Sequence, residues 1–418
     1  DQGIGLLFQG ICDQKFQLAG FVAACGKPGA IVTFDPDAWP AEMIRQAIQG
    51  LQRRWQVSHF DPGKMGNLHG VASFGLDRRL DFVIITTEAN IRPDEGVFPV
   101  TDQTYPVELT APDIEPYRKG NTGVEFVTTF DSGTPGPHVM INAVTHGNEI
   151  CGAIALDHLL RNDVRPIQGK LSLGFVNWMA YSNFDANAAG DSRFVDEDFN
   201  RVWVEDRLDG DEDTAELRRA RELRPIFDTV DQLLDIHSMG TYSKALMICN
   251  GLDKERRFTR AVNFPAYIMC GSGHIVGKRL IEYTPFNDTA NDKVALLVEC
   301  GQHWAKDTGT AALDTALHFL RAAEAVSPDF FAEHVSDEGR APAPAEMWDV
   351  TDGITAKTDN FAFVEPYIGM EVIAKADTVI AHDGGEPITT PYDDCLLMMP
   401  NHKAGAGMRK LRLCKRAG

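Results

Sequence analysis

The chain has 418 residues, of which 44% are hydrophobic and 24% charged, and its formal net charge is -20. This length and composition are typical of a globular protein with two or three domains. The acidity argues against nucleic acid or an anionic membrane as a partner, because both bind basic surfaces.

The eight cysteines are scattered and form no CxxC pair, a pattern that favours reduced, buried thiols over a disulfide framework. No apolar run is long enough to span a bilayer. The short apolar stretch 18–25 lacks the preceding basic residues of a signal peptide. We therefore expect a cytoplasmic protein with no membrane partner, and we leave a homo-oligomer open.

The N-terminal segment, residues 1–110, predicts a small α/β extension. A short strand is expected at 30–34, a helix with apolar spacing over 40–55, and a buried strand at 80–87. A polar segment with prolines, residues 93–117, is typical of a linker. This extension is a candidate for oligomerisation or for covering the site, and the sequence does not decide between them.

From residue 124 onward, predicted strands alternate with predicted helices. The expected strands are 124–130, 138–144, 171–177, 230–236, 244–249 and 294–298, and the expected helices are 149–160 and 311–326. This alternation predicts an α/β domain over residues 120–330, with an open sheet and helices on both faces.

The last part of the chain, residues 345–418, predicts a small all-β domain. It follows a segment rich in Ala and Pro and consists of short runs broken by Gly, Pro and Asp. The expected strands are 361–364, 371–374, 378–381 and 395–399.

Histidines and glutamates follow three of the predicted strands. His146 and Glu149 follow one strand directly. His237 ends a second strand, and Glu299 follows a third. Because open α/β sheets place their sites at the carboxyl ends of strands, we expect these side chains to meet. Three such ligands with a fourth position for water are typical of catalytic zinc, and a further carboxylate can take the proton of that water.

A polar segment between these positions, residues 192–201, contains two arginines and an asparagine. A guanidinium binds a carboxylate through two hydrogen bonds, so this segment is a candidate for anion recognition. The alternative is a surface loop whose charges cancel. His303 is a candidate either for lining the pocket or for a structural role.

Four blocks carry a resemblance to a known family: THGNE, SRFVDEDFNR, DIHS and VECG, in this order. They resemble the succinylglutamate desuccinylase/aspartoacylase family, a branch of the zinc carboxypeptidase superfamily. The resemblance covers residues 120–325, and the tail with GGEPI at 384–388 is similar to the family's C-terminal domain. It implies a zinc-carboxypeptidase-like mixed open sheet. The first hundred residues have no counterpart in it.

The resemblance also implies roles for the matched residues. The implied ligands of one Zn²⁺ per chain are His146, Glu149 and His237. Glu299 is implied as the general base toward the zinc-bound water and later as a proton donor. Arg193 is implied to polarise the scissile carbonyl, and Asn200 with Arg201 to hold the substrate carboxylate. The implied function is zinc-dependent hydrolysis of the amide bond of an N-acyl amino acid or similar small amide.

The sequence leaves the exact substrate open. Aspartoacylases carry a tyrosine and an arginine before the catalytic glutamate, and here Lys278, Arg279 and Tyr283 lie in that stretch without a clear alignment. Related deacetylases that act on N-acetylated diamino acids share the same core, and an acidic pocket would suit their substrates. The alternatives are a metallocarboxypeptidase acting on short peptides and a non-catalytic binding protein on the same fold. Other divalent metals suit the same ligands.

Overall fold

The computed structural model describes residues 105–271, 277–340, 342–403 and 405–417, together with short strands nearer the N-terminus. The chain divides into two compact units, Asp1–Gly96 and Val97–Gly418. The helix expected over residues 40–55 lies outside the described residues.

The first unit contains two pairs of antiparallel strands among its described residues. Strand β1 (Val22–Ala23) pairs with β2 (Val32–Thr33), and β3 (Val71–Leu76) pairs with β4 (Arg79–Ile84). Strands β2 and β4 coincide with the strands expected at 30–34 and 80–87.

The second unit is organised around an 11-stranded mixed sheet with the strand order β14-β17-β18-β12-β10-β9-β11-β8-β6-β7-β5. Its strands are β5 (Val127–Asp131), β6 (His138–Ala143), β7 (Lys170–Phe175), β8 (Gln232–Met239), β9 (Leu246–Cys249), β10 (Tyr267–Cys270), β11 (Val294–Gln302), β12 (Glu346–Thr355), β14 (Val372–Ile373), β17 (Cys395–Met398) and β18 (Arg409–Arg416). Strands β7, β6, β8 and β11 run parallel to one another, whereas β5 and β9 pair in the antiparallel sense. The mixed open sheet expected from the sequence is confirmed.

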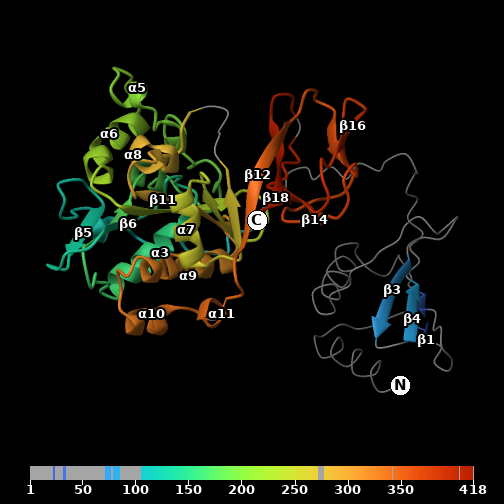
Figure 1. Cartoon of the computed structure of the whole chain (residues 1–418), viewed down its shortest axis with the longest axis horizontal. Helices are drawn as coiled ribbons and strands as arrows, with labels where there is room; N and C mark the ends of the chain where they lie inside the picture. Colours follow the sequence, from blue (N-terminus) through green and yellow to red (C-terminus); the bar gives the residue numbers. More distant parts are fainter. Residues whose placement is uncertain are drawn as a thin grey trace. The chain divides into compact units, whose positions relative to one another are not determined.

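Helices cover both faces of this sheet, as expected (Figure 1). They are α3 (Ile150–Arg161), α4 (Trp178–Tyr181), α5 (Glu205–Leu208), α6 (Ala215–Phe227), α7 (Asp253–Val262), α8 (Thr284–Asn287), α9 (Lys306–Ala322), α10 (Pro328–His334) and α11 (Asp337–Arg340), with 3-10 turns at Glu115–Tyr117 (η3), Phe199–Arg201 (η4) and Leu280–Glu282 (η5). Helices α3, α7 and α9 pack on one face, and α5, α6 and α8 lie on the other.

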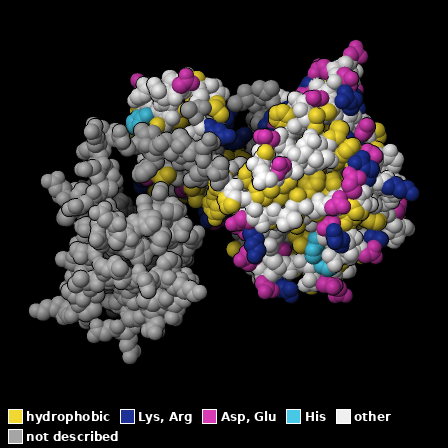
Figure 2. All heavy atoms as spheres, turned by 180° about the vertical axis from the view of Figure 1, so that it is seen from behind, with side chains coloured by type: hydrophobic (Ala, Val, Ile, Leu, Met, Phe, Trp, Pro, Cys, Tyr) yellow, Lys and Arg dark blue, Asp and Glu magenta, His cyan; other side chains and the backbone are white. Residues whose placement is uncertain are grey.

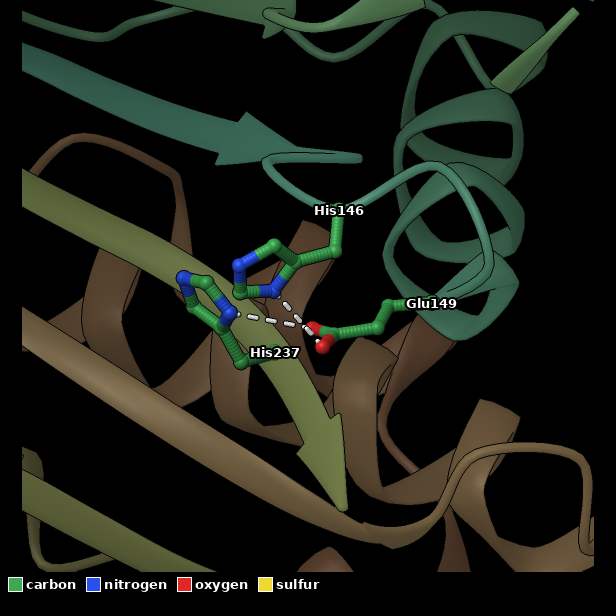
Figure 3. A group of neighbouring side chains, drawn as sticks. All are labelled: His146, Glu149 and His237. Atoms are coloured by element: carbon green, nitrogen blue, oxygen red, sulfur yellow. Dashed lines mark hydrogen bonds and ion pairs between the residues drawn. The ribbon is translucent and has the colours of Figure 1, made fainter. Parts of the chain in front are cut away.

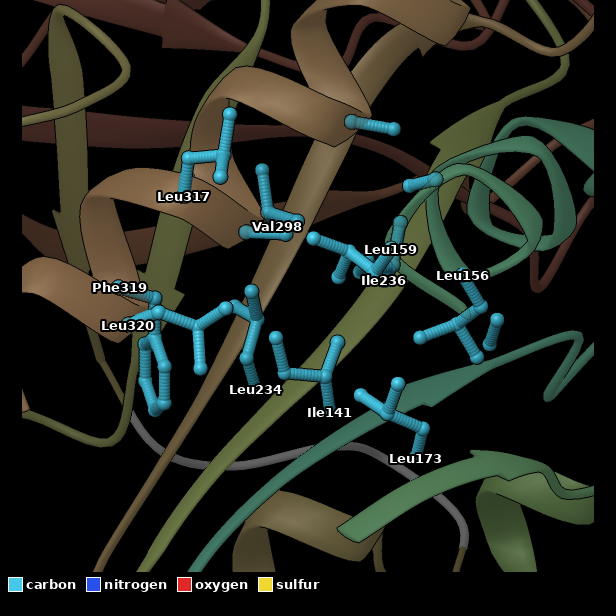
Figure 4. Close-up of a cluster of buried hydrophobic side chains, with 14 of the residues drawn as sticks. Ile141, Leu156, Leu159, Leu173, Leu234, Ile236, Val298, Leu317, Phe319 and Leu320 are labelled. Carbon is cyan, nitrogen blue, oxygen red and sulfur yellow. The ribbon is translucent and has the colours of Figure 1, made fainter. Parts of the chain in front are cut away.

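The central strands alternate their apolar side chains between these two helical layers, as expected for strands buried on both faces. Leu234, Ile236 and Val298 belong to the core beneath α3 and α9 (Figure 4). Leu233 and Leu297 belong to the core on the opposite face. Fully burying each such side chain contributes roughly 1.5–3 kcal/mol, so the strands that carry the site are firmly held.

The C-terminal segment is rich in strands, but most of them extend the main sheet. Strand β12 pairs in parallel with β10, and β18, β17 and β14 follow it in antiparallel order. A separate three-stranded sheet contains β13 (Phe361–Phe363), β15 (Val379–Asp383) and β16 (Glu386–Thr389). Gly384 and Gly385 form the turn between β15 and β16, with φ of 62° and 95°. The domain boundary between residues 330 and 345 stays a prediction.

The surface carries acidic and basic side chains interspersed with apolar ones on the face drawn in Figure 2. Within the part of the chain that the structure describes, no helix combines the length and apolar character needed to cross a bilayer.

Candidate metal centre and cavity

Three buried side chains converge near the carboxyl ends of the neighbouring strands β6 and β8 (Figure 3): His146, Glu149 and His237. Their candidate ligand atoms all lie within 4.8 Å of one another. Nδ1 of His146 lies 2.8 Å from Oε1 of Glu149, and Nδ1 of His237 lies 2.9 Å from Oε2. Two imidazole nitrogens and a carboxylate are a donor set that fits zinc.

The first two of these residues lie in the turn between β6 and α3, whose backbone is tightly constrained. Val144 has φ 56°, a strained conformation for a β-branched residue and one that recurs at functional sites. A Cβ on Gly147 would collide with the backbone of Tyr181 and Ser192, so only glycine fits there. The amide of Gly147 donates a 3.1 Å hydrogen bond to the carbonyl of Arg193, which ties the arginine segment to the metal centre.

The second ring nitrogen of each histidine is held by a carboxylate. Nε2 of His237 lies 2.8 Å from Oδ2 of Asp235, whose Oδ1 accepts a 2.7 Å hydrogen bond from Thr145. Nε2 of His146 lies 2.9 Å from Oδ1 of Asp198. Such carboxylates orient the imidazoles and raise their basicity as ligands. Neither aspartate is among the site residues expected from the sequence, although both lie inside the blocks that carry the family resemblance.

The charges around this centre favour a cation. Burial alone would raise the pKa of Glu149, but the imidazoles of His146 and His237 bring it well below its ordinary value. Burial alone would lower the pKa of His237, yet Asp235 and Glu149 raise it well above its ordinary value. The surroundings therefore stabilise positive charge between these side chains. A bound divalent ion would supply such a charge.

Glu299 approaches the same centre from the neighbouring strand. His237 and Glu299 lie within β8 and β11, because both strands extend beyond the ends expected at residues 236 and 298, and the two are register partners. Oε2 of Glu299 is buried and has no hydrogen-bond partner among the described residues. Burial, together with the nearby charge of Glu149, raises the pKa of Glu299 to about 8. A carboxyl group in this environment can both take up and release a proton near neutral pH.

Arg193 contacts the candidate ligands directly. Its Nη1 lies 3.4 Å from Oε1 of Glu149. Its Nη2 lies 3.0 Å from Nε2 of His146 and 3.2 Å from Oδ2 of Asp198. The guanidinium thus lies directly beside the group of candidate metal ligands.

Asn200 and Arg201 follow in the 3-10 turn η4. The Asp198 side chain caps this turn by accepting a 2.9 Å hydrogen bond from the amide of Asn200. Oδ1 of Asn200 accepts a 2.8 Å hydrogen bond from the amide of Leu280, which fixes the orientation of the Asn200 side-chain amide. A guanidinium nitrogen of Arg201 donates to the carbonyl of Asn200 at 2.6 Å.

A buried carboxylate supports the loop that carries these residues. Glu216, in the first turn of α6, accepts hydrogen bonds from the amides of Val195, Asp196 and Glu197 at 2.7, 3.0 and 3.2 Å. Glu216 is not among the residues expected from the sequence, because nothing in the local pattern distinguishes it from an acidic residue on the surface.

His303 lines the same cavity and is linked to Glu149 through Ser238. Its Nδ1 is 2.7 Å from Oγ of Ser238, and the amide of Ser238 donates to Oε2 of Glu149 at 3.0 Å. Burial lowers the pKa of His303 to about 4, so its imidazole is neutral near pH 7.

One cavity of about 660 Å³ brings together every site residue expected from the sequence: His146, Glu149, Arg193, Asn200, Arg201, His237 and Glu299. The C-terminal strands also line it, through Val350–Gly353, Met398–Asn401, Arg409 and Arg412. Three residues before Glu299 are candidates for substrate binding from the sequence, namely Lys278, Arg279 and Tyr283. Of these, Arg279 lines the cavity. Lys278 instead pairs with Glu205, and the hydroxyl of Tyr283 donates to Asp228.

Comparisons with known proteins bear on the family and the fold. Residues 135–324 match the family model described as the succinylglutamate desuccinylase/aspartoacylase catalytic domain. No curated protein matches the chain at a significant level.

Solved structures share the fold at low sequence identity. A succinylglutamate desuccinylase from Vibrio cholerae is 18% identical, with a TM-score of 0.52 over 70% of this chain and 86% of that chain. A succinylglutamate desuccinylase/aspartoacylase from Rhodobacter sphaeroides is 17% identical, with a TM-score of 0.52 over 70% and 90%. The product-bound ectoine utilization protein EutE (DoeB) from Ruegeria pomeroyi is 14% identical, with a TM-score of 0.50 over 70% and 89%. The family match points to hydrolase activity, and residues 135–324 are similar to the catalytic domain of the succinylglutamate desuccinylase/aspartoacylase family.

Proposed function

We propose that this protein is a zinc-dependent amidohydrolase that cleaves the amide bond of an N-acyl amino acid or a similar small amide. The observation that carries the proposal is the convergence of His146, Glu149 and His237 with Glu299 in one cavity. One zinc ion per chain would be held by the first three of these residues. When bound, zinc supplies a Lewis acid that polarises a carbonyl and makes water more acidic.

Glu299 is proposed to move the protons of the reaction. It accepts a proton from the attacking water and delivers it to the nitrogen of the leaving amine. Its buried, unpartnered oxygen and its raised pKa support both halves of this task. A bound cation lowers that pKa and so favours the proton-accepting form before attack.

Arg193 is proposed to stabilise the negative charge that develops on the carbonyl oxygen. Its guanidinium is already anchored beside the metal centre by Glu149 and Asp198, so little reorganisation is needed during reaction. Asn200 and Arg201 are proposed to bind the carboxylate of the amino-acid half, with the amide of Asn200 oriented by Leu280.

The cavity favours this function over the alternatives. Its volume is in the range of small-molecule sites, and the C-terminal strands that line it restrict access for longer peptides. Its lining contains Arg193, Arg201, Arg279, Arg409 and Arg412, which disfavours a diamino-acid substrate. A cytoplasmic location and a homo-oligomeric state stay predictions.

The test is an amine-release screen of zinc-loaded protein against N-acetyl, N-formyl and N-succinyl amino acids, with short peptides as a parallel set. We expect release from at least one N-acyl amino acid. Release from peptides alone would identify a carboxypeptidase, and stoichiometric binding without turnover of any compound would identify a binding protein. Protein stripped of metal by a chelator is the control.

A further inference from the structure

Two buried thiols lie side by side at the ends of strands β9 and β10. Cys249 and Cys270 are the last residues of these parallel strands and are register partners. Because register partners on parallel strands point to the same face, both side chains enter the same hydrophobic core. Sγ of Cys249 donates a hydrogen bond to Sγ of Cys270 at 3.2 Å. Neither thiol lines the cavity, so the proposed hydrolysis uses neither of them.

The backbone geometry at this pair is compatible with a disulfide bond. Neighbouring strands lie about 4.8 Å apart, so the Cα atoms of register partners have about this separation. Disulfides join residues whose Cα atoms lie roughly 4.4–6.8 Å apart. Both Cys249 and Cys270 are free thiols in the structure. A covalent bond can therefore form between them without a large displacement of either strand.

A third residue of the same row reaches solvent. Asp349 on β12 is the register partner of Cys270 on the side opposite to Cys249. The side chain of Asp349 is 40% exposed, whereas both cysteines are buried. The row of Cys249, Cys270 and Asp349 therefore runs from the interior toward the surface. A small solute that enters from the side of Asp349 meets Cys270 before Cys249.

A guanidinium group lies near the outer end of this row. Arg256 of α7 pairs with Asp349, and its Nε donates to the carbonyl of Gly251 at 2.9 Å. A Cβ on Gly251 would lie 3.4 Å from Nη2 of Arg256 and 3.8 Å from Cβ of Cys270, which places the guanidinium near this thiol. The hydrogen bond from Cys249 and the positive charge of Arg256 outweigh burial and lower the pKa of Cys270. A lower pKa increases the fraction of thiolate, the form that reacts with oxidants.

We propose that Cys249 and Cys270 form a site of reversible oxidation, at which a peroxide converts the two thiols into a disulfide. The thiolate of Cys270 attacks a peroxide oxygen. An S–O bond forms, the O–O bond breaks, and the released oxygen takes the proton that Cys270 gave up. Sγ of Cys249 then attacks Sγ of Cys270, so that an S–S bond forms and the S–O bond breaks. The hydroxide that departs takes the thiol proton of Cys249 and leaves as water. Two thiols are oxidised and one peroxide is reduced, independently of the proposed hydrolysis.

The test maps the cross-link directly in the full chain. Folded protein is treated with hydrogen peroxide, the remaining thiols are blocked with N-ethylmaleimide, and unreduced tryptic peptides are measured by mass spectrometry. Trypsin separates the two cysteines, because Cys249 lies in the peptide 245–254 and Cys270 in the peptide 261–278. We expect these two peptides to appear joined, with the mass of two hydrogen atoms lost, and to separate after dithiothreitol. Protein denatured in urea gives the background of unspecific pairing among the cysteines.

Variants separate the two steps. In Cys249→Ala the second thiol is missing, so Cys270 should keep the added oxygen as a sulfenic acid that dimedone traps. Arg256→Gln should slow disulfide formation several-fold, because the thiolate of Cys270 loses a nearby positive charge, and Arg256→Lys should restore most of the rate. Arg257→Gln is the matched control, since Arg257 is an exposed cation on the same helix, and its rate should equal that of wild type. Thermal melting verifies that each variant folds.

Each outcome decides for or against the site. A joined peptide pair that forms faster in folded than in denatured protein supports it. The proposal is overturned if oxidised wild type yields no such pair, if folding gives no advantage in rate, or if Cys249 and Cys270 pair mainly with other cysteines. Dimedone on Cys270 in Cys249→Ala supports the order of the two steps. An Arg256→Gln protein that reacts at the wild-type rate would overturn the assignment of Cys270 as the thiol that reacts first.

Discussion

His237 and Glu299 are register partners on the adjacent parallel strands β8 and β11. Register partners on parallel strands point to the same face of the sheet, about 4.8 Å apart along the hydrogen-bonding direction. The backbone pairing therefore places a candidate metal ligand next to the candidate base. A one-residue slip of β11 would turn Glu299 to the opposite face.

Glu299→Gln should retain the metal and the fold while turnover collapses. Glutamine has nearly the same size but cannot accept the proton of water, and a general base contributes on the order of 10²–10⁴-fold. Steady-state kinetics on the best substrate of the screen measures the loss, and elemental analysis measures zinc. Wild-type turnover in this variant would refute the proposed mechanism.

His237→Ala should lose both zinc and activity. The substitution removes one of three ligands and leaves Glu149 and Asp235 with less compensating charge. Wild-type protein is expected to carry about one zinc per chain by elemental analysis, and chelation should lower its melting temperature because zinc binds only the folded site. A His237→Ala protein that keeps the wild-type zinc content would show that the ligand assignment is wrong.

Arg193→Ala and Arg201→Ala should differ in their kinetic profiles. Arg193 is proposed to act on charge that develops during reaction, so its loss should mainly lower kcat, by about 10²–10³-fold. Arg201 is proposed to bind a substrate carboxylate that is charged in both the ground state and the transition state, so loss of Arg201 should mainly raise KM. Because Arg193 contacts Glu149 and His146, zinc content is measured in both variants. Identical profiles in zinc-loaded proteins would contradict these separate roles.

Glu216→Gln should loosen the loop that carries Arg193, Asn200 and Arg201. Glu216 accepts backbone hydrogen bonds from three consecutive residues, and a neutral amide accepts them less strongly. We expect a loss of about 2 kcal/mol in unfolding free energy, in line with lost charged hydrogen bonds. Denaturant unfolding measures the stability, and hydrogen exchange should show faster exchange at residues 195–197.

Glu222→Gln is the matched control for that measurement. Glu222 lies on the same helix and is exposed, and its partner Arg219 is buried. Arg219 also donates to the backbone carbonyls of Val176 and Glu125, so it keeps partners when the carboxylate of Glu222 is replaced. The effect of Glu222→Gln on unfolding should therefore stay under about 1 kcal/mol. An equal loss of unfolding free energy in both variants would mean that the contacts of Glu216 with the loop do not contribute measurably to stability.

Several elements follow directly from local sequence. The run His138–Ala143 and the spacing after Glu149 predict β6 and α3 to within one or two residues. Elements in which polar residues interrupt the apolar pattern are absent from the expectations, among them β12, β18, α6 and α7. Helix α6, with the sequence AELRRARELRPIF, is largely charged, so its buried face stands out weakly against its polar residues.

The sequence by itself determined which residues make up the candidate centre, because His146, Glu149, His237 and Glu299 lie in short blocks whose residue types and order can be read without a structure. Tertiary structure alone decided that Asp198 and Asp235 hold the histidines, that Glu216 supports the arginine loop, and that strand β18 brings Arg409 and Arg412 into the cavity. The physical reason is that the spacing of apolar residues along a segment shows only which face of that helix or strand is buried. Pairing between strands that lie tens of residues apart in the sequence depends on register and packing, which no local pattern encodes.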